Sequence, residues 1–195
     1  MKIKRIVAYV LDMIIISIIT EVILFIPIFG NTKDVYMETS QEYFNLVLNA
    51  STGSSDITED EEIETMYDMQ KSAQTINIIT VGCIILYFGV SAYICNGQTL
   101  GKKILNLKIV PVKNSELKPH LFILRTVIIT NIIPRIIMII ITAALSMKTW
   151  YNVSVYVSQI QYIIMFMILG FIIFREDERG LHDLLCDTKV ISTKE

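Results

Sequence analysis

The sequence contains few of the residues that build disulfides, metal sites and enzyme centres. It has only three cysteines and two histidines in 195 residues. The cysteines (Cys83, Cys95 and Cys186) show no CxxC spacing and are odd in number, so neither a disulfide framework nor a metal site is indicated. The sequence also lacks an HxxxH metal helix, a phosphate-binding loop and a serine nucleophile elbow. We therefore expect no cofactor, no bound metal, no nucleic-acid partner and no enzymatic activity.

The sequence is also poor in charge for its size. Charged residues make up 18% and hydrophobic residues 53% of the chain, and the mean hydropathy is +0.55. An ordinary soluble domain carries about 25% charged residues and fewer apolar ones. This composition predicts an integral membrane protein, with the lipid bilayer as its main partner.

Four apolar segments are long enough to cross a bilayer, which needs about 20 helical residues. They are residues 6–29, 76–95, 121–147 and 153–174. The first follows a basic start, as a signal peptide would, but it contains Asp12 and Glu21 and no small-x-small cleavage site follows it, so we expect a retained helix. Since backbone groups in lipid must bond internally, the predicted fold is an all-α, four-transmembrane-helix bundle forming a single domain over residues 1–195.

The third apolar segment is unusual because it contains Arg125, Asn131, Pro134 and Arg135. An arginine near the centre of a membrane helix costs about 2.5–3.5 kcal/mol, which isoleucines at about −0.5 kcal/mol each can offset. Pro134 is predicted to kink the helix. The alternative is a re-entrant or interfacial helix, which would leave three spans.

Lysine and arginine divide unevenly between the two sides of this bundle, with 12 on one side and three on the other. The first side has Lys2, Lys4, Arg5, Lys102, Lys103, Lys108, Lys113, Lys118, Arg175, Arg179, Lys189 and Lys194, and the second has Lys33, Lys71 and Lys148. The positive-inside rule therefore predicts a protein of the cell membrane with both chain ends in the cytoplasm.

Two segments outside the apolar runs have structural signals. Residues 30–75, predicted to be external, carry ten acidic side chains and two lysines, and Thr58 precedes Glu61 at capping-box spacing, which predicts a helix that runs toward the second span. We expect the acidic side chains to form a solvated face. On the other side, "LNLKIVPVK" (105–113) and "TKVIST" (188–193) predict a small pair of strands.

The acids of the first span are the main candidate functional residues. Arg5 and Asp12 are seven residues apart and so lie within about 20° on one helix face, but roughly 10 Å apart along the axis. Arg125 is therefore an alternative partner for Asp12. Glu21 lies on the opposite face from Asp12, toward the outer half.

The polar residues of the third span are expected to face the bundle. Arg125, Asn131 and Arg135 fall within an arc of about 120°, and such residues avoid lipid. Arg135 and Glu21 are predicted to form a pair in mid-membrane. Two interpretations remain open: the charges hold helices together, or Asp12 or Glu21 binds a cation or proton during transport.

Three separated motifs resemble the RDD family of membrane proteins. They are "KRIVAYVLD" (4–12), "GQTLGKKILNLKIV" (97–110) and "RGLHDLLCDTKVI" (179–191). By this resemblance Arg5, Asp12 and Asp183 match the residues that name the family. Further positions that fit its pattern are Gly97, Gln98, Gly101, Arg125 and His182. The sequence departs from the pattern at Cys186-Asp187, where small residues are more usual in the family.

The motifs lead to a prediction about the cytoplasmic face. With the topology above, we expect Arg5, Arg125, His182 and Asp183 to gather there, with Asp183 in a salt bridge to Lys102, Lys103 or Arg125. Asp12 would reach into this cluster from above. The adjacent His182 and Asp183 are interpreted as an interfacial contact, not a catalytic dyad.

Two functions compete. The resemblance implies transport of an ion or small solute, and four short helices then suggest a homo-oligomer or a partner membrane protein. The alternative is a non-transporting scaffold or accessory subunit whose acidic external segment binds a partner. A water-accessible cavity lined by Asp12 or Glu21 would favour transport, whereas full pairing of both acids would favour the scaffold.

Overall fold

The computed structural model describes residues 2–53, 57–112 and 118–193. Lys113 and Lys194, which enter the charge count above, lie outside these ranges. The structure is 78% helical and contains a small two-stranded sheet. This confirms the predicted fold class, an all-α membrane protein with a small strand pair.

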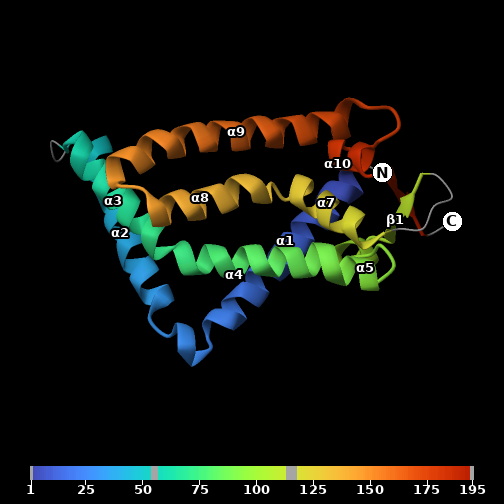
Figure 1. Cartoon of the computed structure of the whole chain (residues 1–195), viewed down its shortest axis with the longest axis horizontal. Helices are drawn as coiled ribbons and strands as arrows, with labels where there is room; N and C mark the ends of the chain where they lie inside the picture. Colours follow the sequence, from blue (N-terminus) through green and yellow to red (C-terminus); the bar gives the residue numbers. More distant parts are fainter. Residues whose placement is uncertain (1, 54–56, 113–117, 194–195) are drawn as a thin grey trace.

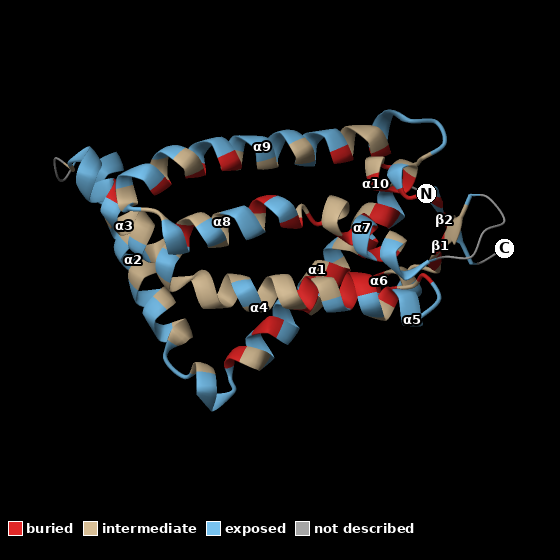
Figure 2. Ribbon diagram, in the orientation of Figure 1, coloured by how far each residue is buried: buried red, intermediate tan, exposed pale blue. Residues whose placement is uncertain are grey.

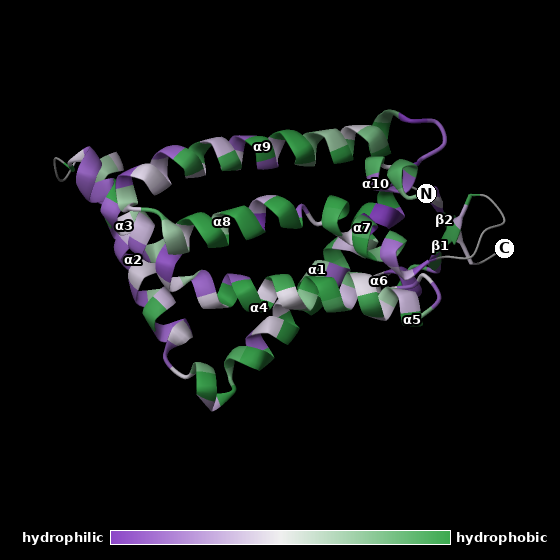
Figure 3. Ribbon diagram, viewed as in Figure 1, coloured by the Kyte–Doolittle hydropathy of each residue, from purple (hydrophilic) through white to green (hydrophobic). Residues whose placement is uncertain are grey.

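Three helices are long and apolar enough to cross a membrane, and a bent pair of helices makes up to four. They are α1 (Lys2–Leu24), the continuous helix of α4 (Gln74–Ile84), η2 (Ile85–Ser91) and α5 (Ala92–Ile94), α9 (Met147–Phe174), and the pair α7 (Pro119–Ile129) and α8 (Ile132–Ala144). Apolar residues cover most of the length of these helices, and polar residues gather at the two ends of the molecule's long axis (Figures 1 and 3). The segment η2 is a π-helix, a local widening that is often found at functional sites.

The third apolar segment is broken into two helices, an arrangement that fits either a broken span or the re-entrant alternative, and the break does not lie at Pro134 as predicted. The chain bends by 69° between α7 and α8, where Asn131 takes the left-handed conformation with φ 54° and ψ 44°. Asparagine tolerates this conformation better than most residues. Pro134 sits instead in the first turn of α8, where its missing N–H would have no partner within the helix. The side chain of Asn131 donates to the backbone oxygen of Gln161 in α9 at 2.9 Å, which fixes the break against its neighbour.

Replacing Asn131 by alanine should destabilise the protein by about 2 kcal/mol, because it combines a left-handed strain of about 1 kcal/mol with the loss of one hydrogen bond. Thermal unfolding of the purified protein measures the change. Asn131→Gly removes only the hydrogen bond and should lie between the wild type and Asn131→Ala. If Asn131→Gly is less stable than Asn131→Ala, the left-handed backbone conformation does not explain why asparagine occupies position 131.

The α2–α3 end of the molecule is formed by residues that precede the second span. Here η1 (Pro27–Phe29) leads into α2 (Thr32–Ser51), and α3 (Glu59–Ser72) packs against it (Figure 1). Thr58 caps α3 by accepting a hydrogen bond from the backbone N–H of Glu61 at 3.3 Å, and α3 runs almost directly into α4, so the predicted helix is confirmed. The Tyr67 hydroxyl lies 3.3 Å from the backbone oxygens of Thr142 and Leu145, which satisfies carbonyls at the end of α8.

The opposite end, called here the strand end, holds α6 (Leu100–Ile104), β1 (Leu107–Pro111), α10 (Leu181–Leu185) and β2 (Thr188–Ser192). The strands pair antiparallel with Ile109 opposite Val190, which confirms the predicted strand pair. Their buried side chains (Leu107, Ile109 and Val190) pack with Ala8 and Phe122 of α1 and α7. The sheet therefore ties two segments far apart in sequence to the same end of the bundle.

Burial is uneven along the bundle (Figure 2). A second apolar core joins Ile16 of α1 to Ile84, Phe88 and Ile132 of the second and third spans. Much of α9 remains exposed, and its exposed residues are largely apolar (Figures 2 and 3). An exposed and largely apolar helix face is typical of a membrane span that faces lipid.

Candidate functional site

Four side chains from three helices meet at the strand end and form what is called here the Asp183 cluster: Arg5, Arg125, His182 and Asp183. The Asp183 carboxylate is fully buried. It forms ion pairs with Arg5 Nη2 and with Arg125 Nη1, the latter at 2.5 Å. Since Arg5 lies in the first turn of α1 and Arg125 lies in α7, one carboxylate joins these two helices to α10.

Neutral donors complete the surroundings of Asp183. Its Oδ2 accepts the backbone N–H of Gly180 at 3.2 Å, and its Oδ1 accepts the Thr188 hydroxyl at 3.3 Å. Burial alone would raise the pKa of Asp183, but the charges of Arg125 and Arg5 hold it well below the usual carboxyl range. The group is therefore an anion at neutral pH, and the predicted salt bridge from Asp183 to Arg125 is present.

His182 lies in this cluster but makes no hydrogen bond. Its side chain is fully buried, and neither ring nitrogen has a partner among the described residues. Nε2 is 3.5 Å from Asp183 Oδ2. Burial lowers the pKa of His182 well below its ordinary value, and Arg125 lowers it further, so the imidazole is neutral. Leaving a buried N–H without a partner costs about 1–3 kcal/mol, so this ring needs an explanation beyond packing.

Asp12 forms a separate network with neutral donors, and not the predicted pair with Arg5 or Arg125. Its carboxylate is fully buried. It accepts hydrogen bonds from the Tyr87 hydroxyl at 2.7 Å, the Thr99 hydroxyl at 2.5 Å and the Gly101 backbone N–H at 2.7 Å. Lys102 Nζ is 4.0 Å from Asp12 Oδ2. Asp12 is thus paired and closed to water, which answers the question left open by the sequence.

The family motif after the second span has a direct steric role. A Cβ on Gly101 would lie 2.8 Å from Asp12 Oδ1 and would also collide with the backbone oxygen of Ala8. Gly97 has φ +87°, which favours glycine. The Gln98 side chain donates to the backbone oxygen of Leu107 at 3.0 Å and joins this turn to β1. These residues therefore shape a turn that brings the Gly101 backbone N–H up to Asp12.

Lys102 connects the two polar groups. Burial lowers the pKa of Lys102 to about 8. Charged neighbours modify this effect, with Arg125 and Arg5 lowering the pKa and Asp12 and Asp183 raising it. The side chain also lies over the Phe88 ring at 5.6 Å. It is therefore a largely buried amine whose charged neighbours are two arginines and two carboxylates.

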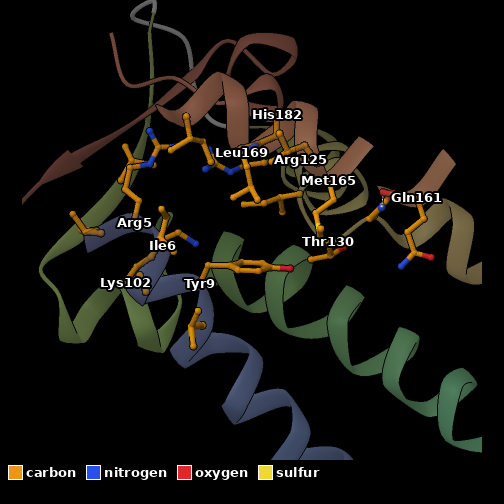
Figure 4. A pocket seen from close by; sticks show the side chains of 18 of the residues that line it. Arg5, Ile6, Tyr9, Lys102, Arg125, Thr130, Gln161, Met165, Leu169 and His182 are labelled. Atoms are coloured by element: carbon orange, nitrogen blue, oxygen red, sulfur yellow. Dashed lines mark hydrogen bonds between the residues drawn. The ribbon is translucent and has the colours of Figure 1, made fainter. Parts of the chain in front are cut away.

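A cavity of about 350 Å³ lies between α1, the broken α7–α8 pair and α9 (Figure 4). Arg5, Lys102, Arg125 and His182 line it near the strand end, and polar residues of the middle of the spans continue it. These are Tyr9, Thr130, Asn131, Arg135 and Gln161. Gln161 lies roughly 20 Å from the end of α9 by helical rise, so the cavity extends from the strand end to mid-membrane.

The predicted pair of Arg135 with Glu21 is not formed. Glu21 is half-exposed and pairs with Lys33 at 2.5 Å, toward the α2–α3 end. The break at Asn131 turns α8 away from the line of α7, so residues on both sides of the break no longer share the arc of one straight helix. Arg135 instead lines the cavity, and none of the described residues forms an ion pair with it.

Sequence reasoning missed several residues of the site. Tyr87 and Thr99 hold Asp12, while Tyr9 and Gln161 line the cavity. Gln161 carried a signal, because an amide within an apolar span avoids lipid. The tyrosines carried none, since their packing depends on the π-helix and on the path of α1.

Of three comparisons with known proteins, one gives a match. A family model described as the RDD family matches residues 3–187. No curated protein and no solved structure matches the chain. Among the described residues, no group of three or more His, Cys, Asp or Glu side chains is arranged to hold a metal ion.

Proposed function

The chain belongs to the RDD family, and on this premise we propose that it carries a small solute across the membrane through the cavity between α1, α7–α8 and α9. The observation that carries the proposal is the cavity itself. It is partly open to the surroundings of the bundle and larger than the small voids that close-packed protein interiors leave. A space of about 350 Å³ corresponds to roughly a dozen water molecules at liquid density.

The broken third span supports transport over a purely structural role. Non-helical backbone at membrane depth is tolerated where it is buried in protein or lines a cavity, and Thr130 and Asn131 at the break both line this one. Interrupted helices are also a recurrent feature of substrate sites in secondary transporters. The break gives the cavity wall a hinge between α7 and α8.

The Asp183 cluster supports a closed state at the strand end. Arg5 and Arg125 reach Asp183 from α1 and α7, on two sides of the cavity. Passage of a solute toward this end requires these contacts to separate.

Asp12 is held by three donors, Glu21 is paired with Lys33, and neither acid lines the cavity. Pairing of both acids favours the scaffold over cation transport at these residues. The transport proposal therefore rests on the cavity and not on Asp12 or Glu21.

The remaining parts of the proposal concern placement and partners. The asymmetry in lysine and arginine supports a cell-membrane protein whose strand end, with both chain ends, faces the cytoplasm. The small bundle supports a homo-oligomer or a partner membrane protein. We propose no enzymatic role.

Flux into proteoliposomes tests the proposal, with sodium, potassium, protons and hexyl phosphate as the four solutes. Met165→Trp should fill the cavity and reduce flux at least tenfold, because Met165 lines it. The matched control is Met167→Trp. Met167 lies on the same helix with a similar exposed fraction, 45% against 42%, but lines a different pocket.

Transport is supported if the wild type and Met167→Trp move one of these solutes and Met165→Trp does not. If no solute moves faster than in empty liposomes, the non-transporting scaffold becomes the better function. If both tryptophan variants lose flux equally, the cavity is not the path.

A further inference from the structure

The cavity wall carries more positive charge than the protein neutralises. Four cations line it: Arg5, Lys102, Arg125 and Arg135. No carboxylate from the part of the chain that the structure describes lines it. Among the described residues, Asp183 and Asp12 are the acids within 4.0 Å of these cations, and they lie behind the wall. Two positive charges therefore lack an opposite charge.

Arg135 is the cation with the least compensation. It lies in the middle of the bundle, in the first half of α8. Its Nε is buried without a hydrogen-bond partner, and no described residue accepts a hydrogen bond from its guanidinium. An arginine at the centre of a membrane helix costs about 2.5–3.5 kcal/mol even on insertion scales, and pairing normally offsets this cost.

His182 gives a second, independent observation at the other end of the cavity. It lines the cavity, is fully buried, and has two ring nitrogens without partners. A neutral imidazole can donate one hydrogen bond. Both orphan groups that line the cavity are thus N–H donors that lack an acceptor.

Between these polar ends the wall is apolar. The residues concerned are Ile129, Met165, Ile168, Leu169 and Ile172. Figure 4 shows Leu169 and Met165 between Arg5 and Gln161. A hydrated inorganic ion would gain little from this surface, whereas a hydrocarbon gains about 25 cal/mol for each Å² removed from water.

We propose that the cavity binds a small organic anion, with an oxyanion head held by Arg135 and an apolar body against α9. This rests on the proposed function and names the class of its solute. Tyr9 and Gln161 line the same part of the cavity and supply further donors for the head. The bound anion would provide the negative charge that the wall lacks. The same chemistry occurs in a soluble phosphate ester and in the head group of an acidic lipid.

Equilibrium binding of hexyl phosphate to the protein in nanodiscs of neutral phosphatidylcholine tests this inference, with empty nanodiscs as the background. The wild type should bind hexyl phosphate, and Arg135→Gln should weaken binding about 10- to 100-fold through loss of a charge-assisted hydrogen bond. Arg135→Lys should restore part of the affinity. Lys103→Gln removes an exposed cation next to Lys102 and outside the cavity, and should leave affinity unchanged.

Matched ligands separate the head from the body. Hexylammonium should not displace bound hexyl phosphate, because it has the same apolar body but a cationic head. Inorganic phosphate should displace it only at higher concentration than unlabelled hexyl phosphate does, because it lacks the apolar body. A further readout is the NMR signal of the Arg135 guanidinium, which a bound oxyanion should shift because it would supply the acceptor that Arg135 Nε–H lacks. A purely structural role of Arg135 would not produce this shift.

Nanodiscs with phosphatidic acid distinguish the two sources of the anion. If phosphatidic acid displaces hexyl phosphate from the wild type, the anion is a lipid head group, and if it does not, the ligand is a soluble ester. Absence of binding, equal binding of hexylammonium, or unchanged affinity in Arg135→Gln would overturn the inference. Binding of hexyl phosphate without flux would support the anion site and contradict the transport proposal. Sodium or potassium flux without binding of hexyl phosphate would support transport and contradict the anion site.

Discussion

Asp183→Asn should destabilise the protein by about 3–5 kcal/mol, enough to abolish its accumulation in the membrane. The substitution keeps the size of the side chain but removes the one carboxylate that contacts both Arg5 and Arg125. Both guanidinium groups are buried, and breaking a buried pair by removing one partner leaves an uncompensated charge. The loss would separate α1 and α7 from α10. Membrane abundance and thermal unfolding in detergent measure the effect.

Asp177→Asn is the matched control, because it makes the same chemical change in the same segment at an exposed ion pair with Arg175. It should leave stability nearly unchanged, since exposed pairs contribute little. A double-mutant cycle gives a sharper test. Asp183→Asn combined with Arg125→Gln should cost less than the sum of the two single changes, because the second removes a cation that the first left unpaired. Simple additivity would contradict the pairing.

The second large effect is expected at Gly101. Gly101→Ala should destabilise the protein by about 3 kcal/mol, since the new Cβ collides with Asp12 and with the α1 backbone. Relief requires α6 to move away from α1, and this movement breaks the Gly101 N–H bond to Asp12. A buried carboxylate then loses one of its three donors. Thermal unfolding of the purified variant measures the change.

Gly82→Ala is the control for this prediction. Gly82 lies inside α4, and a Cβ there meets nothing within 4 Å. Alanine is about 1 kcal/mol better than glycine within a helix, so this variant should be as stable as the wild type or more stable. If both variants behave alike, the close approach of Gly101 to Asp12 does not decide stability.

The two charge predictions from the sequence differ in outcome for a physical reason. The Asp183–Arg125 pair followed from topology, because both residues belong to the same end of the bundle whatever the details of packing. The Arg135–Glu21 pair required the third span to be a straight helix. The left-handed Asn131 bends the chain by 69°, and no periodicity in the sequence reveals such a break.

The sequence by itself determined that this chain is a helical membrane protein of the RDD family, with a strand pair that joins its middle segment to its tail. The length of the apolar segments and the family motifs are local properties of the sequence, so they can be recognised without knowledge of any tertiary contact. Only the tertiary structure decided that the Asp12 carboxylate is buried and accepts three hydrogen bonds, and that the cavity is lined by Arg135 instead. Both depend on how helices distant in sequence pack, through the π-helix that presents Tyr87 and the bend that turns α8.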